Sequence, residues 1–195
     1  ADVSSQVYRG GDSRRPVLRA VSATRGQILL FGGKPAATYY HACAAGRTVP
    51  AQEVWGRDYP YLQSVISPDL ACNRVNWDSR LSTDDAGQRL GLGKLLQAKI
   101  ISFQPSGRVK QVRFWGRSGK KDFNVQDVRK KLGWDVVRSS DFRVSVADGK
   151  ILVLRGHGSG HGVGMSQWGA RGLALKGKNY TEILQHFYPG TTFRK

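Results

Sequence analysis

The chain has 195 residues, 39% of them hydrophobic and 10% aromatic, which is typical of a folded globular protein and excludes a disordered tail. Thirty-one Lys and Arg against 14 Asp and Glu leave a formal net charge of +17, so the surface attracts polyanions. No apolar run approaches the ~20 residues of a membrane-spanning helix, which excludes that class.

The first half of the chain is predicted to contain two hairpins and one helix. Residues 21–43 pair two β-rich runs across a Gly-Gly dipeptide, because glycine supplies the positive φ that a tight turn needs. Residues 82–90 form a helix that begins at a serine N-cap. Residues 99–116 form the second hairpin, with a Ser-Gly turn.

The second half is predicted to contain one more hairpin and three helices. Residues 124–133 begin at an asparagine N-cap and end at a glycine, as a short helix does. Residues 142–154 form a hairpin with an Asp-Gly turn. Residues 166–177 and 179–190 are the last two helices, and each ends at a glycine.

This order of elements predicts a strand-rich α+β domain with antiparallel hairpins and a few short helices. It has no βαβ rhythm and no internal repeat. We expect a single domain over residues 1–195, with a small inserted lobe at residues 78–140, where much of the basic charge lies.

A glycine-rich loop with two histidines lies between the last predicted hairpin and the helix at Ser166. The stretch RGHGSGHGVGMSQWGA, residues 155–170, keeps its backbone bare, so another group can approach it closely. No nucleotide-binding glycine motif is present. Taken alone, His157 and His161 fit a site and a structural role equally well, because their spacing means little outside a helix.

The same stretch closely resembles the C-terminal signature of the SpoIID/LytB family, the sporulation stage II protein D and amidase-enhancer domain. The matching segment is GHGSGHGVGMSQWGARGLALKGKNYTEILQHFYPGT. QVYRG at residues 6–10, VWG at 54–56 and YPYLQSV at 59–65 follow the family's order upstream. The resemblance covers nearly the whole chain, which we interpret as the C-terminal part of the family domain.

The resemblance implies an extracytoplasmic protein, in the periplasm, cell wall or a secreted form, that acts on peptidoglycan. The intact protein is expected to be a lytic transglycosylase that cleaves MurNAc–GlcNAc bonds and leaves 1,6-anhydro-MurNAc ends. The alternative is a non-catalytic peptidoglycan-binding module or an amidase enhancer, with a cell-wall amidase or a separate N-terminal chain segment as partner. A basic nucleic-acid-binding module rests on charge alone, since no recognition motif is present.

The glutamate that the family uses as its acid lies in a segment before residues 6–10 and is not in this sequence, which begins at Ala1. We interpret the chain as a mature product or an excised part of a longer protein. Of its two glutamates, Glu53 and Glu182, only Glu53 is a candidate acid, and the family pattern does not assign it that role. The catalytic residue therefore remains unassigned.

The resemblance places several side chains in a substrate cleft lined by the glycine loop. Tyr61, Trp55 and Trp168 are candidates for stacking on sugar faces. The predicted substrate-binding residues are His41, Thr48, Tyr61, His157, His161, Ser166 and Gln167.

Cys43 and Cys72 allow one disulfide, which an oxidising compartment favours. Some members of the family hold zinc in this region, and residues two apart in a strand point to the same side. His41, Cys43 and Cys72 are therefore the alternative zinc ligands, with free thiols as the third possibility. The bridge would exclude the metal, and no other cofactor is expected.

Overall fold

The computed structural model describes residues 14–69, 71–73 and 75–195, in two compact units. The QVYRG segment lies outside the described residues. The first unit joins the N-terminal residues up to Ala36 with the C-terminal Thr191–Lys195, and the second is Ala37–Gly190.

The first unit contains helix α1 (Arg15–Ala23) and a three-stranded antiparallel sheet in the order β11-β1-β2. Its strands are β1 (Ile28–Phe31), β2 (Lys34–Pro35) and β11 (Thr192–Arg194). The predicted turn between β1 and β2 is confirmed, and both of its glycines have positive φ.

The predicted hairpin at residues 21–43 is wrong at both of its ends. Residues 21–23 form the last turn of α1. A proline in the first turn of this helix favours its start, because the fixed φ of proline suits that position. The pairing of the second arm with β1 ends at Pro35, because proline has no backbone N–H to donate. Further on, β3 (Tyr40–His41) pairs in parallel with β10 (Met165–Ser166) instead.

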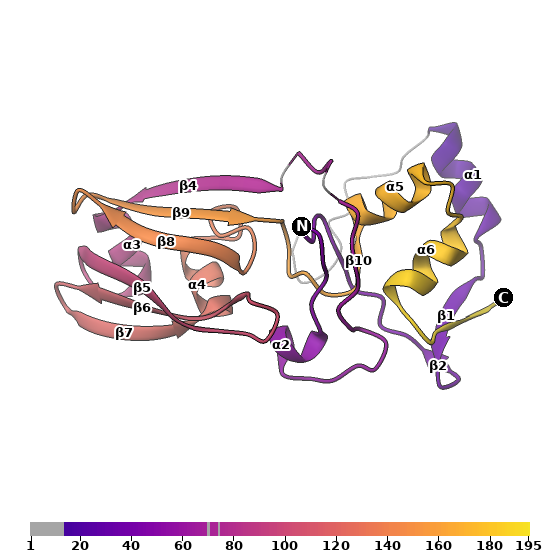
Figure 1. Cartoon of the computed structure of the whole chain (residues 1–195), viewed down its shortest axis with the longest axis horizontal. Coiled ribbons are helices and arrows are strands. Elements are labelled where there is room, and N and C mark those ends of the chain that lie inside the picture. The colour runs from indigo at the N-terminus through magenta and orange to yellow at the C-terminus, as the bar shows by residue number, and fades with distance from the viewer. Residues whose placement is uncertain (1–13, 70, 74) are drawn as a thin grey trace. The chain divides into compact units, whose positions relative to one another are not determined.

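The second unit is built mainly from two three-stranded antiparallel sheets, in the orders β4-β9-β8 and β5-β6-β7. The strands are β4 (Asn76–Ser82), β5 (Leu95–Phe103), β6 (Val109–Gly116), β7 (Gly119–Asn124), β8 (Asp141–Ala147) and β9 (Ile151–His157). The predicted hairpins β5–β6 and β8–β9 are confirmed. Figure 1 shows helices α3 (Thr83–Leu90) and α4 (Val125–Leu132) beside these sheets.

Side chains between Trp77 and Leu154 form the main hydrophobic core of the described residues. It is made by the inner faces of the strands and the apolar faces of α3 and α4. Its fully buried members include Leu95, Phe114 and Leu152. The core thus draws on strands β4 and β9 at its edges, beyond the predicted inserted lobe at residues 78–140, which stays a prediction.

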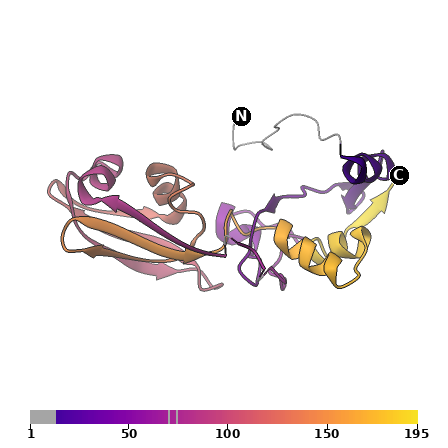
Figure 2. The same ribbon diagram turned by 90° about the horizontal axis from the view of Figure 1, so that it is seen from above.

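The remaining helices of the second unit are α2 (Ala51–Trp55), α5 (Gln167–Leu175) and α6 (Tyr180–Phe187). Figure 2 shows α5 and α6 side by side. The predicted N-caps Ser82 and Asn124 are confirmed, because each accepts a hydrogen bond from a backbone N–H of the first helical turn, and Ser166 caps α5 in the same way. The sequence therefore predicts the class correctly, a strand-rich α+β chain.

None of the helices in the described residues is long and apolar enough to cross a membrane.

Candidate functional site

The glycine loop runs beside residues 39–49, and backbone hydrogen bonds join the two segments along their length. Cys43 forms an antiparallel bridge with Ser159, the Val49 N–H donates to the Gly162 carbonyl at 2.9 Å, and the Met165 N–H donates to the Tyr39 carbonyl. The bare backbone of the loop therefore packs against the chain itself. A Cβ at Gly164 would lie 2.1 Å from the Tyr39 oxygen, so this position requires glycine.

His41 and His161 meet across these segments, with ring centroids 5.4 Å apart. Nε2 of His161 donates to the Tyr40 carbonyl at 3.0 Å, and its Nδ1 accepts from the Val163 N–H at 3.1 Å. Nδ1 of His41 donates to the Val163 carbonyl. The two partners of His161 fix its neutral form, because a carbonyl can only accept and an N–H can only donate, whereas the carbonyl at His41 fixes only the proton on Nδ1.

Burial is the main cause that lowers the pKa values of both histidines. It brings that of His41 to about 3, with a further contribution from the nearby His161, and that of His161 to about 4. Nε2 of His41 is buried and has no hydrogen-bond partner among the described residues. At neutral pH the pair is therefore uncharged, with one free acceptor.

A continuous row of rings extends from this pair. His161 contacts Trp55 at 5.2 Å between centroids, and Trp55 contacts Tyr39 at 4.5 Å. Tyr39 in turn contacts Tyr59, which contacts Tyr61. Trp55 is 42% exposed and Tyr39 39%, so the middle of the row faces solvent. We call Tyr39, Trp55, Tyr59 and His161 the aromatic platform.

Buried Asp69 joins several segments of the chain through hydrogen bonds. Its carboxylate accepts hydrogen bonds from the Ala44 and Gly46 N–H groups, at 2.5 and 2.8 Å. It also accepts from the hydroxyls of Ser67 and Ser166. Four charge-assisted hydrogen bonds to one buried carboxylate join three separate stretches of sequence. The composition gives no sign of this role, although an aspartate after Ser-Pro is typical of a turn.

Three of the predicted binding residues lie in structural positions. The Ser166 hydroxyl is buried between Asp69 and the N-terminus of α5. The Thr48 hydroxyl is buried too, donating to the Gln63 carbonyl and accepting from the Val65 N–H. The Tyr61 hydroxyl accepts from the Ala37 N–H. By contrast, Gln167 is exposed at the first turn of α5.

Glu53 lies on α2, two residues before Trp55 of the platform. Its carboxylate accepts hydrogen bonds from the N–H and the hydroxyl of Ser106, in the turn between β5 and β6. A pocket of about 550 Å³ is lined by this carboxylate together with Arg108 and Asp141. Arg108 is buried, which lowers its pKa, and donates to the carbonyls of Ala44 and Arg47. The other glutamate, Glu182, has a structural role: it forms the capping box of α6 with Asn179.

His157 does not join the other two histidines. It ends β9, its side chain is 60% exposed, and its Nδ1 lies 3.9 Å from a carboxylate oxygen of Asp141. The resemblance grouped His157 with His161 because they are close in sequence. His157 is the last residue of β9, His161 lies in the loop after it, and the two side chains take part in different sets of contacts.

The two cysteines are both buried, and the structure shows them without a bond between their sulfur atoms. Burial, and then a hydrogen bond with Cys72, raise the pKa of Cys43 to about 12. His41 directs its ring to Val163 and His161, so the zinc set of His41, Cys43 and Cys72 is not assembled. No three His, Cys, Asp or Glu side chains of the described residues are arranged to hold a metal ion. The thiols are in contact, and the bridge between them stays a prediction.

Comparison with known proteins identifies relatives of the chain. No protein-family model matches it. It is 35% identical over 95% of its length to an uncharacterized protein of Brachyspira hyodysenteriae, and 33% identical over 90% to a stage II sporulation protein D of Bacillus amyloliquefaciens. It is also 25% identical over 96% of its length to an amidase enhancer of Bacillus subtilis.

The chain spans 50% of each of the first two relatives and 34% of the third. A stage II sporulation protein D and an amidase enhancer both align over 90% or more of this chain. The glycine loop, the closing helices and the proteins that the chain matches thus agree: over the part of the relatives that it spans, the chain is similar to a stage II sporulation protein D and to an amidase enhancer, as the resemblance to the SpoIID/LytB family predicts.

Proposed function

We propose that this chain binds peptidoglycan glycan strands outside the cytoplasm, as part of a protein that cleaves MurNAc–GlcNAc bonds. The observation that carries the proposal is the aromatic platform. Its exposed rings offer apolar faces to sugar rings, and neighbouring polar groups can orient hydroxyl and acetamido substituents. The names of the relatives, a sporulation protein and an amidase enhancer, support a role at the cell wall.

The proposed cleavage is an intramolecular transglycosylation. A carboxylic acid protonates the glycosidic oxygen as its bond to C1 of MurNAc breaks. The 6-hydroxyl of the same MurNAc then bonds to C1, and its proton returns to the carboxylate. The products are a 1,6-anhydro end and a free 4-hydroxyl, and no water is consumed.

In this proposal the residues of the chain position the strand for that step. The platform holds sugar rings, and the exposed Gln167 contacts polar substituents. The proton donor is not assigned to a residue of this chain. Glu53 stays a weak candidate for the proton donor, because its carboxylate is hydrogen-bonded to Ser106 in the turn between β5 and β6.

The chain offers a matched pair of tryptophans for the test. Trp55 lies in the platform and is 42% exposed, whereas Trp134 lies under the guanidinium of Arg129, outside the platform, and is 45% exposed. Purified glycan strands would be offered to the protein and to the variants Trp55→Ala and Trp134→Ala in a pull-down. We expect Trp55→Ala to weaken retention about tenfold, the value of one stacking contact, and Trp134→Ala to leave it within about twofold.

Equal losses in the two variants, or no retention of strands by the unmodified chain, would refute the proposal. Duplex DNA at matched salt is the competitor, because a purely electrostatic binder would prefer it. Mass spectrometry of the strands for 1,6-anhydro ends, with Glu53→Gln beside the parent, reports in addition whether this chain cleaves by itself.

A further inference from the structure

A second set of polar side chains lies on the sheet β4-β9-β8, away from the residues of the platform. The strand registers place them in two cross-strand rows, and residues two apart in a strand share a face. The rows are Asn76–His157–Asp141 and Asp78–Arg155–Arg143.

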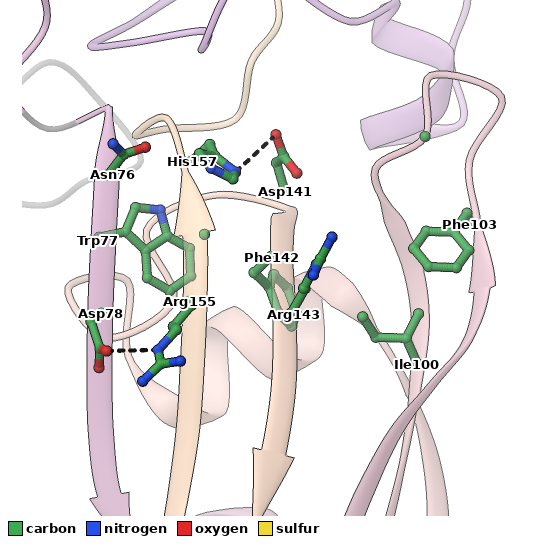
Figure 3. Close-up of a pocket in the computed structure, with 12 residues that line it drawn as sticks. Asn76, Trp77, Asp78, Ile100, Phe103, Asp141, Phe142, Arg143, Arg155 and His157 are labelled. Atoms are coloured by element: carbon green, nitrogen blue, oxygen red, sulfur yellow. Dashed lines mark hydrogen bonds and ion pairs between the residues drawn. The ribbon is translucent and has the colours of Figure 1, made fainter.

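These rows line a pocket of about 760 Å³. Its remaining wall includes Ile100 and Phe103 of β5. Phe103 is 59% exposed, a high value for a large apolar side chain. In Figure 3 both of these side chains extend from β5 toward β8. The pocket therefore joins a charged face to a small apolar wall.

The charges of the pocket are only partly compensated within the chain. Asp78 accepts from Arg155 at 2.9 Å and from Arg80 at 3.2 Å, and these hydrogen bonds lower its pKa. The backbone of Arg143 pairs with β9, but its guanidinium makes no hydrogen bond or ion pair with any residue that the structure describes. Figure 3 shows its guanidinium between β8 and β5, without an interaction to the residues drawn.

A buried donor in the same pocket also lacks a partner. The side chain of Trp77 is 6% exposed, and within the described part of the chain its indole N–H has no acceptor. Trp77 lies across Gly156, where any Cβ would come within 2.3 Å of its ring. In Figure 3 the nitrogen edge of the indole faces Asn76 and His157. An unsatisfied buried donor is costly, so an acceptor from a ligand would be favoured here.

We propose that this pocket binds a carboxylate carried beside a methyl group. The planar guanidinium of Arg143 matches a carboxylate in two parallel hydrogen bonds, and Phe103 with Ile100 receives the methyl group. Two parts of peptidoglycan have this chemistry: the lactyl ether of muramic acid and the terminal alanine of a stem peptide. The assignment of the ligand to peptidoglycan rests on the proposed function.

Chain connectivity keeps the pocket close to the platform. His157 lines the pocket, and His161 of the platform follows four residues later. Four residues span at most about 14 Å, so one glycan strand can touch both. The platform would then hold sugar rings, while the pocket reads the substituent that distinguishes MurNAc from GlcNAc.

The test follows the indole N–H resonance of Trp77 by NMR, identified through the variant Trp77→Phe. The probes are N-acetylmuramic acid, N-acetyl-D-alanyl-D-alanine, and N-acetylglucosamine, which has no carboxylate. We expect at least one carboxylate probe to shift the resonance in a saturable manner and N-acetylglucosamine to leave it in place. The probe that titrates identifies the source, the lactyl group or the stem peptide.

Arg143→Gln and Arg80→Gln form the matched pair of variants. Both remove one charge from the same face of the sheet, but Arg80 does not line the pocket. We expect Arg143→Gln to weaken the carboxylate probe about tenfold or more, and Arg80→Gln to change it less than twofold. Equal effects, or no shift with either carboxylate, would overturn the proposal.

The two proposals fail in different ways. If glycan strands are retained through Trp55 while neither carboxylate titrates, the pocket proposal is wrong and the proposed function stands. If a carboxylate titrates through Arg143 but strands are not retained, the site exists and its ligand is not peptidoglycan.

Discussion

At the scale of single residues, the neutral histidine pair is the feature with the clearest consequence. The ordinary pKa of histidine is about 6.5, and burial lowers those of His41 and His161 to about 3 and about 4. Between these values and about pH 6.5 the unfolded chain binds protons that the folded chain does not. The contribution of the pair to stability is therefore complete above about pH 6.5 and falls as the pH is lowered.

This predicts that lowering the pH decreases the free energy of unfolding, in part because His161 takes up a proton when the chain unfolds. Between about pH 7.5 and pH 5 the free energy of unfolding should fall by roughly 2 kcal/mol for each buried histidine, on top of what other groups contribute. His161→Gln should lose less over the same interval, by about that amount, in urea unfolding. His157→Gln is the control, because His157 is exposed, and should keep the pH dependence of the parent. If both variants keep it, His161 does not titrate as the buried pair requires.

At the scale of elements, two glycines on one face of α5 allow this helix to pack closely against Ser67 and Pro68. A Cβ at Gly172 would lie 2.0 Å from the Pro68 carbonyl oxygen, and one at Gly169 would lie 2.2 Å from the Ser67 hydroxyl. In an isolated helix alanine is more stable than glycine by about 1 kcal/mol. At Gly172 the close approach of the helix backbone to the Pro68 carbonyl outweighs this preference for alanine.

We therefore expect Gly172→Ala to destabilise the protein by about 1–3 kcal/mol, although it improves helix propensity. Chemical denaturation of the variant measures this loss directly. Leu175→Ala on the same helix is the control, since Leu175 is 71% exposed, and its effect should stay within about 0.5 kcal/mol. A stabilised Gly172→Ala protein would mean that α5 does not pack against residues 67–69 as described.

At the scale of the whole molecule, the main core belongs to one continuous stretch of chain. All members of the cluster lie between Trp77 and Leu154, and the two ends of the stretch are neighbours because Asn76 pairs with His157. Adjacent ends are what an inserted folding unit needs, since its closure costs little chain entropy.

Residues 76–157 are accordingly predicted to fold on their own. The fragment should show β-rich circular dichroism and a single cooperative urea transition. The same fragment with Leu152→Asp, a charge in the fully buried core, is the control and should be unfolded. A fragment without a cooperative transition would show that its core depends on the rest of the chain, and the inserted lobe would then be rejected.

Local features could be read from the residues alone. The turns at Gly32-Gly33 and at Ser106-Gly107, and the N-caps at Ser82 and Asn124, depend on neighbours a few positions away. The family, too, followed from the glycine loop and the closing helices. The misplaced start of the first hairpin shows the limit, because Val21–Ala23 have β-like neighbours but complete a helix.

Which side chains meet could not be read in this way, because the contacts join residues far apart in sequence. His41 reaches His161 and Asp69 reaches Ser166 only when the glycine loop lies along residues 39–49. The same packing buries Thr48 and Ser166 and leaves His157 in another pocket. The sequence by itself determined most of the local elements and the resemblance to the family, through short-range preferences and a specific motif. Only the tertiary structure decided the platform and the carboxylate pocket, because burial and the pairing of charges are set by neighbours from every part of the fold.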